Sequence, residues 1–445
     1  MRLKYKFCII LFCGLYISNS SYCQKLTGRI LDSSNNPIPY AHISLPGTEI
    51  GTVSNDSGFF TLNISKTLFK IKISSIGFEE KFLSNTEMSF DDLNKVYLNF
   101  SKISLKEVVV KGTFDSASWY VQQAIKNITK NYSNKKHSQI AFYRESSVRD
   151  SIYSRMVEAI VMLSDKGVNS PSEKTQYEVL RLRKTEDNRN IGWRQSLQNW
   201  LYQDAGVYAM NKANPFKPTD AEEQDFNEVL VSPSLAKLRK ESPTRLLNTG
   251  FVEDNVYSIV SQFQIGEEEF IKINFKRADK ELIKFFETGG YLIINKDDYA
   301  IIEFNRWVKN VKKSSNDDGF RANYLIQYQK SGDLYFPFFI RDMVVGSNAS
   351  RIFDIADSEQ YYSTKGKIGK IYTVNELYIL ETKDYEKISW RSEMSKDDDM
   401  YDIQPTKRLG FTFDNINTIP INPISQKMIT DLTQNNSIDA LFIEE

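Results

Sequence analysis

Short runs of alternating apolar and polar residues, separated by turn-forming residues, fill much of the second half of this chain. The runs are Val256–Gln264, Glu269–Lys276, Gly290–Asn295, Ala300–Val311, Asn323–Lys330, Leu334–Val345 and Lys370–Glu381. Tight turns such as Asn295–Asp298 and Ser331–Asp333 separate them. Strands joined by tight turns pair antiparallel with their sequence neighbours. The sequence therefore predicts an antiparallel meander sheet over 256–381, the core of a β-rich domain that we place at 115–445.

A helix is predicted to open this second domain. Val121, Ile125, Ile128 and Tyr132 recur at helical spacing behind the capping candidates Asp115, Ser116 and Ser118. A hairpin, Gln139–Arg149 and Ser151–Leu163, is expected to follow it. The stretch 171–250 is mixed and polar, with helix-like segments near Trp193–Tyr202 and Ala221–Lys240, and its order is left open.

The N-terminal part of the chain has strands at a different spacing. Between residues 26 and 100 they recur every eight to twelve residues, and a turn signal such as Asn55–Gly58 separates each pair. This spacing is typical of an all-β sandwich. Gly58 and Gly77 lie where the chain turns, so we expect positive φ there.

Glycines, prolines and aromatic residues of this region follow a familiar order. They are Gly28-x-Ile30-x-Asp32, Pro37–Ala41, Gly47-Thr48, Gly51–Phe60 and Ile73–Phe78. In this order they resemble the carboxypeptidase-regulatory-like domain. The resemblance implies a transthyretin-like β-sandwich over 24–101, a non-catalytic accessory fold that often precedes the plug of bacterial outer-membrane receptors.

Two further resemblances bear on the partner and the ligand. Leu105–Gly112 is similar to the segment that joins this sandwich to the plug of TonB-dependent receptors, and we read 102–114 as a linker or edge strand. The 333 residues after Gly112 are too few for a plug and a barrel of 22 strands. A partner protein of the envelope, or a role in a TonB-dependent-type system, is therefore expected. Gly289–Ile302 faintly resembles the strand-turn-strand of half-barrel lipoprotein-carrier folds.

The first 23 residues predict export. Three basic residues precede the apolar run Phe7–Ile17, which is typical of a signal peptide and too short to span a bilayer. We expect cleavage after Cys23, with lipidation of Cys23 as the alternative. The expected location is the periplasm or the outer membrane of a Gram-negative bacterium. The remaining chain has 54 basic and 57 acidic residues, which gives no indication of nucleic-acid binding, and no later segment has the length and hydropathy of a transmembrane helix.

Residue types that carry out most enzyme chemistry are scarce. The three cysteines, Cys8, Cys13 and Cys23, lie in the signal peptide, and the two histidines, His42 and His137, are expected to be solvated. Nucleophile-elbow and phosphate-loop motifs do not occur. The carboxylate clusters Glu267–Glu269, Asp317-Asp318 and Asp397–Asp399 read as solvated turns. Arg144-Glu145 and Glu158, charges within strand-like runs, could form a paired interior network, but outward positions are the simpler reading.

The sequence therefore predicts a mainly β, non-enzymatic, exported envelope protein that acts in binding or assembly. We assign no catalytic, metal or cofactor-binding residue and no cofactor, and the ligand-binding residues stay open. Two alternatives remain. One is a periplasmic carrier of a hydrophobic or lipid-like ligand, and the other is a carboxylate-dependent glycan hydrolase, which needs two acids about 5 to 9 Å apart in a cleft.

Overall fold

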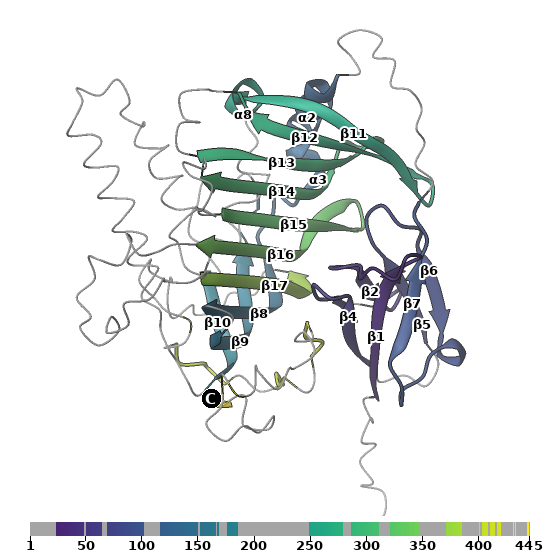
Figure 1. Ribbon diagram of the computed structural model, residues 1–445, viewed down its shortest axis with the longest axis vertical. Helices are drawn as coiled ribbons and strands as arrows, with labels where there is room; N and C mark the ends of the chain where they lie inside the picture. Colours follow the sequence, from purple (N-terminus) through teal and green to yellow (C-terminus); the bar gives the residue numbers. More distant parts are fainter. Residues whose placement is uncertain are drawn as a thin grey trace, which may run out of the picture.

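The computed structural model describes residues 24–48, 50–64, 69–101, 116–149, 152–165, 167–168, 176–185, 249–278, 286–310, 321–346 and 371–384, with short pieces of 400–444. Within them the fold is mainly β, as predicted (Figure 1). Leu105–Gly112, Trp193–Tyr202, Ala221–Lys240, Asp317-Asp318 and Asp397–Asp399 lie outside the described residues.

The N-terminal sandwich consists of two small sheets. One has the order β4 (Phe59–Ile64), β1 (Gln24–Asp32), β7 (Asn94–Leu98), and the other has the order β3 (Gly51–Val53), β2 (His42–Ser44), β5 (Lys70–Ser74), β6 (Lys81–Ser84). A short 3-10 helix, η1 (Asn85–Glu87), follows β6. Alternate residues such as Leu26, Ile43, Phe60 and Ile71 fill the space between the sheets. Gly58 and Gly77 have the expected positive φ, and a side chain at Gly58 would also overlap the Ile30 carbonyl oxygen.

Among the described residues, the large sheet has eleven strands, each paired antiparallel with its neighbours. Their order is β11 (Asn255–Ile265), β12 (Glu268–Arg277), β13 (Phe286–Asn295), β14 (Ile301–Asn310), β15 (Arg321–Ser331), β16 (Leu334–Gly346), β17 (Ile371–Asp384), β8 (His137–Arg149), β9 (Ile152–Asp165), β10 (Gln176–Lys184) and β18 (Ile443–Glu444). The predicted meander is confirmed as β11–β17. The predicted hairpin β8–β9 continues the same sheet, because β8 pairs with β17 along its whole length.

Two glycines in β13 allow its neighbouring strands to approach closely. A Cβ atom at Gly290 would overlap the carbonyl oxygen of Asn305 in β14, and a Cβ at Gly289 would lie 2.6 Å from the indole of Trp307. Glycines inside strands permit such close backbone approach.

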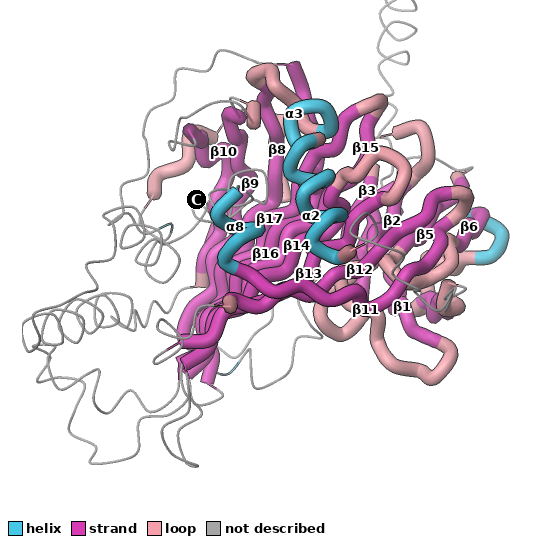
Figure 2. The backbone as a smooth tube through the Cα atoms, turned by 90° about the horizontal axis from the view of Figure 1, so that it is seen from above, coloured by secondary structure: helices cyan, strands magenta, loops and turns pink. Residues whose placement is uncertain are grey.

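The two faces of the large sheet have different covers. We call one face the helix face, because the helices pack on it. They are α2 (Ala117–Lys126), α3 (Ile128–Asn131) and α8 (Thr249–Asp254), and they lie together on one side of the sheet (Figure 2). The other, the sandwich face, carries Phe142, Ile160, Leu325, Phe339 and Tyr378 and contacts Val53 of the sandwich. Strand residues alternate between the two faces. No helix among the described residues is long and apolar enough to cross a membrane.

The predicted helix over Asp115–Tyr132 is present but divided. The Ser116 hydroxyl accepts a hydrogen bond from the Trp119 backbone N–H at 3.2 Å and caps α2, which ends at Asn127 before the single turn of α3. The Tyr132 hydroxyl then donates to the Ile301 carbonyl at 2.7 Å and accepts from the Ile301 N–H at 2.9 Å. Ile301 lies at an irregularity of the β13–β14 pairing, so this one hydroxyl satisfies both of its backbone groups.

Tyr132→Phe is therefore expected to lower the free energy of unfolding by about 1–3 kcal/mol, because two buried backbone groups lose their partner. Urea denaturation followed by circular dichroism measures the change. Tyr97→Phe, at an exposed hydroxyl, is the matched control. A loss no larger than that of the control would contradict the role of the Tyr132 hydroxyl.

Candidate functional site

One transverse row of side chains on the sandwich face carries charges of alternating sign. In register across five adjacent strands lie Arg341 (β16), Glu376 (β17), Arg144 (β8), Glu158 (β9) and Arg183 (β10). We call this row the charge ladder. Opposite charges placed directly across neighbouring strands attract each other.

The inner members of the charge ladder are buried and closely paired. Arg144 donates from Nε to Glu158 Oε1 at 2.7 Å, and Arg183 donates from Nε to Glu158 Oε2, also at 2.7 Å. Arg144 Nη1 lies 3.7 Å from Glu376 Oε2. Glu158 is 0 % exposed, and Arg144 5 %. The reading of Arg144 and Glu158 as outward, solvated residues is therefore wrong, because both faces of these strands are covered and the paired interior network is the arrangement found.

The pKa values of the two glutamates in the charge ladder are shifted in opposite directions. Burial alone would raise the pKa of Glu158, but the guanidinium groups of Arg144 and Arg183 outweigh it and lower that pKa. Burial raises the pKa of Glu376, and Arg144 and Arg341 offset this only in part. The difference follows from geometry, since two arginines donate hydrogen bonds to Glu158 while Arg144 approaches Glu376 less closely.

Glu145 belongs to a second buried network on the helix face. Arg155 donates from Nε to Glu145 Oε1 at 3.0 Å, and the Tyr143 hydroxyl contacts both Glu145 Oε2 and Asn375 Oδ1 at 3.1 Å. Glu145 is 1 % exposed, so its expected outward position is also wrong. The adjacent residues Arg144 and Glu145 thus point to opposite faces of the sheet.

The sandwich contacts the large sheet at one end of the charge ladder. Asp56 Oδ2 accepts from Arg341 Nη2 at 3.2 Å, which adds a sixth charge of alternating sign to the row. The Tyr40 ring stacks on Phe339 with centroids 4.9 Å apart, and the Arg341 guanidinium lies 5.4 Å from the centre of the Tyr40 ring. Charge pairing and aromatic packing therefore act at the same contact.

A C-terminal segment joins the sandwich to the ladder. We call residues 411–413 and 416–419 the strap, since they lie between the edge strands β3 and β4 and the large sheet. Thr52 donates to the Thr418 carbonyl at 3.3 Å, and Asn63 Nδ2 donates to the Ile416 carbonyl at 3.0 Å. Arg144 also donates to the Ile419 carbonyl, and the Arg183 guanidinium lies 4.3 Å from the centre of the Phe413 ring.

Neither histidine is solvated as expected. The His42 side chain points outward from the sandwich, but this outer surface packs against the second domain. There the His42 ring centroid lies 4.9 Å from that of Phe338. Burial, together with the charge of Lys72, lowers the pKa of His42 to about 4. His137 is 8 % exposed and packs edge-on against Phe336. Among the described residues, no three or more His, Cys, Asp or Glu side chains are grouped to hold a metal ion.

Beyond the ladder, Glu303 of β14 is a buried carboxyl group without an arginine in its hydrogen-bond set. It accepts from the Tyr291 hydroxyl and from Gln327 Nε2, each at 2.7 Å. Burial raises the pKa of Glu303, and these hydrogen bonds and the charge of Lys272 offset only part of that increase. The folded protein therefore holds the proton of Glu303 more tightly than the unfolded chain does.

The free energy of unfolding should depend on pH through Glu303. Because its folded-state pKa is raised, its stabilising contribution is complete below about 4.5 and is lost as the pH rises through the folded pKa. Glu303→Gln should therefore become more stable relative to the natural protein as pH increases from 4 to 8. Urea denaturation across that range measures the difference, with Glu267→Gln at an exposed turn controlling for loss of one negative charge. If the difference in unfolding free energy between Glu303→Gln and the natural protein did not change with pH, the raised pKa of Glu303 would be contradicted.

Comparisons with known proteins concern both parts of the chain. No curated protein matches it. Among solved structures, a putative outer membrane lipoprotein-sorting protein domain from Vibrio parahaemolyticus is 9 % identical, with a TM-score of 0.26, over 62 % of this chain and 95 % of that one. A DUF1329 family protein from Desulfovibrio piger is 8 % identical, with a TM-score of 0.22, over 61 % of this chain and 95 % of that one. Residues 26–110 match the family model of the CarboxypepD_reg-like domain, which confirms the resemblance of the sandwich.

Proposed function

We propose that this protein is a non-catalytic component of the cell envelope that binds a partner protein through the outer edge of its sandwich. The observation that carries the proposal is the asymmetry of the sandwich. Its edge strands β3 and β4 are tied to the strap, while the opposite edge strands β6 and β7 expose large aromatic side chains. These are Phe82 in β6, 45 % exposed, and Tyr97 in β7, 41 %, and Phe100, just after β7, is 54 % exposed.

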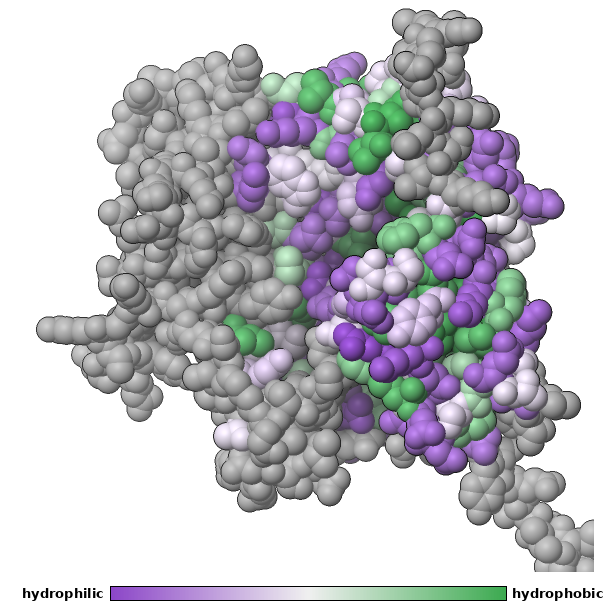
Figure 3. Space-filling view, turned by 45° about the vertical axis from the view of Figure 1, so that its right-hand side comes forward, coloured by the Kyte–Doolittle hydropathy of each residue, from purple (hydrophilic) through white to green (hydrophobic). Residues whose placement is uncertain are grey.

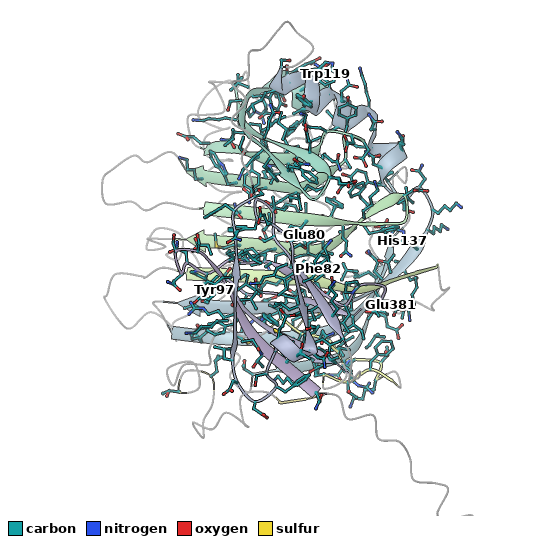
Figure 4. The ribbon with its side chains drawn as sticks, turned by 90° about the vertical axis from the view of Figure 1, so that its right-hand side faces the viewer. Glu80, Phe82, Tyr97, Trp119, His137 and Glu381 are labelled. Atoms are coloured by element: carbon teal, nitrogen blue, oxygen red, sulfur yellow. The ribbon has the colours of Figure 1, made fainter. Side chains whose placement is uncertain are left out.

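The exposed aromatic residues lie at the edge of the sandwich formed by β6, β7 and the residues after β7, with Phe82 on the same face of its sheet as His42. Phe100 stacks on Phe78 with centroids 4.8 Å apart, in a short antiparallel bridge that joins the ends of the two sheets. Lys81 Nζ donates to the Tyr97 carbonyl at 3.1 Å, and Phe82 and Tyr97 both lie on the face shown in Figure 4. Among the described strands none pairs with the outer edges of β6 and β7, and strand edges of this kind with exposed aromatic residues are suited to adding a strand of a partner protein.

The charged groups of the ladder support a structural rather than a catalytic role. Arg144 lies between Glu158 and Glu376, and the strap covers Arg144 through the Ile419 carbonyl. A glycan hydrolase needs one carboxyl group free to donate a proton and another free to attack or activate water. Carboxylates held by arginines under a cover stabilise the packing of the two domains instead.

Site-specific photocrosslinking in the intact cell envelope tests this function. A photoreactive phenylalanine at Phe82 or Tyr97 should give one defined adduct, and the same residue at Val260, which is 50 % exposed on β11, should not. The double variant Phe82→Ser, Tyr97→Ser should then weaken binding of the identified partner in purified form. An adduct from position 260 alone, or turnover of a substrate by the purified protein, would contradict the proposal.

The helix face favours a second candidate, a carrier for a hydrophobic ligand. Its cover is almost wholly apolar, with Val121, Ala124 and Ile128 of α2 and α3 packed on the sheet. A ligand bound there would have to displace these helices. Native mass spectrometry of freshly purified protein should detect a bound lipid if the carrier function holds, and ligand-free protein from several growth conditions would count against it.

A further inference from the structure

The sandwich face has a different character over β12–β15. Here polar and aromatic side chains lie beside the apolar Ile293 and Leu325, and we call Lys272, Tyr291, Glu303, Asn305, Trp307, Asn323 and Gln327 the polar strip. Strand pairing makes them contiguous, because Tyr291 lies opposite Asn305, and Trp307 lies between Gly289 and Asn323. The part of the large sheet beside the sandwich is mostly hydrophilic in the space-filling view (Figure 3).

The indole of Trp307 packs over Gly289 of the neighbouring strand. A Cβ atom at Gly289 would be 2.6 Å from one ring carbon of its indole and 3.1 Å from another, so the ring occupies the space above the glycine. The Trp307 side chain is partly exposed, with Lys309 Nζ 5.2 Å from the ring centre. A flat aromatic ring on a sheet surface offers an apolar platform of fixed orientation.

Hydrogen-bonding groups with spare capacity surround this platform. The Asn305 and Asn323 amides donate to each other at 3.2 and 3.3 Å, which leaves each amide a second N–H and a free lone pair. Gln327 is 7 % exposed, and while its Nε2 donates to Glu303, its buried Oε1 has no hydrogen-bond partner among the described residues. A buried acceptor without a partner is costly, and a ligand donor or a water can remove that cost.

The lysines on and beside the strip, Lys272, Lys276 and Lys309, already have partners. Glu287 lies 3.4 Å from Lys276 and 3.2 Å from Lys309, and Lys272 Nζ lies 3.9 Å from the centre of the Tyr291 ring. A polyanionic ligand therefore meets no excess of free cationic groups. The groups left for binding are the Trp307 indole and the neighbouring Asn305 and Asn323 amides. Together they complement a ligand that has apolar C–H faces and many hydroxyl groups.

We infer that the polar strip binds a β-linked glycan chain, with one sugar ring on the Trp307 indole and its neighbours hydrogen-bonded to Asn305, Asn323 and Gln327. This site is separate from the partner-binding edge of the sandwich and does not depend on it. It engages the glycan without breaking a bond, so no catalytic group is required.

Isothermal titration of the full chain with cellohexaose and with N-acetylchitohexaose tests the inference. At least one of them should bind, Trp307→Ala should weaken that binding about tenfold, and Trp307→Phe, which keeps a flat ring, should retain most of it. Asn323→Ala should also weaken binding, whereas Leu93→Ala removes an exposed apolar residue elsewhere and should leave binding unchanged.

Two results would overturn the inference: no binding of either hexasaccharide at millimolar concentration, or equal binding by the natural protein and by a folded Trp307→Ala variant. Circular dichroism establishes that the variants are folded. Crosslinking at Phe82 is expected to be unchanged in Trp307→Ala, so a failure of the glycan site can be told apart from a failure of partner binding.

Discussion

Arg144→Met is expected to lower the free energy of unfolding by about 3–5 kcal/mol, the largest effect of any single substitution in the charge ladder. The substitution removes the partner that Glu158 and Glu376 share and leaves the Ile419 carbonyl without its donor. Arg183 still pairs with Glu158, but Arg341 is then the one arginine among the described residues that offsets the burial of Glu376. Urea denaturation at neutral pH, followed by far-ultraviolet circular dichroism, measures the loss.

Lys330→Met is the matched control for this experiment. Lys330 Nζ lies 3.1 Å from Asp298 Oδ2, but its side chain is 44 % exposed, so water screens the pair. Its loss should cost at most about 1 kcal/mol. If Arg144→Met cost no more than Lys330→Met, the ladder would have to be accessible to water, and the account of a sealed contact between the domains would be wrong.

Phe413→Ala is expected to have the second largest effect, with a loss of about 3–5 kcal/mol. The Phe413 ring is 6 % exposed and fills the space between Arg183 and the apolar cluster of the sandwich face. Its removal leaves a cavity beneath the strap and also loosens the carbonyl groups that Thr52 and Asn63 bind. Hydrogen exchange should therefore become faster in β3 and β4.

Phe411→Ala controls for removal of an aromatic ring from the strap. Phe411 packs at the same cluster but is only half-buried, so its loss should cost less. The strands β6 and β7, on the far side of the sandwich, serve as an internal reference for exchange rates. Unchanged exchange in β3 and β4 of a destabilised Phe413→Ala protein would show that the strap stabilises the large sheet alone.

Local patterns in the sequence predicted much of the fold. The turns Asn295–Asp298 and Ser331–Asp333 separate strands that pair with their sequence neighbours, so the meander β11–β17 could be predicted. The pairing of β17 with β8 could not, because it joins segments more than 200 residues apart that no turn connects. Strand β10 lies within the stretch whose order the sequence left open, since its charged residues Arg181, Arg183 and Lys184 obscure its alternation.

The sequence suggested a paired interior network at Arg144, Glu145 and Glu158 but favoured outward positions for them, which is wrong. Alternation along β8 assigns Arg144 and Glu145 to opposite faces, but it cannot show that both faces are covered. The cover of Arg144 comes from Ile419, 275 residues away, and from a strap whose apolar residues Phe411, Phe413, Ile416 and Ile419 follow no regular period. His42 was misread for the same reason, because an outward face of one domain became an inner face of the whole protein.

The strap and the charge ladder are expected to fix the sandwich to the large sheet as one rigid unit. The most direct test of this claim is a distance measurement by double electron–electron resonance between spin labels on Lys95→Cys in β7 and Asn274→Cys in β12. The chain from residue 24 onward contains no other cysteine. We expect a single narrow distance distribution that broadens in Arg144→Met. A broad distribution in the otherwise natural protein would contradict the claim.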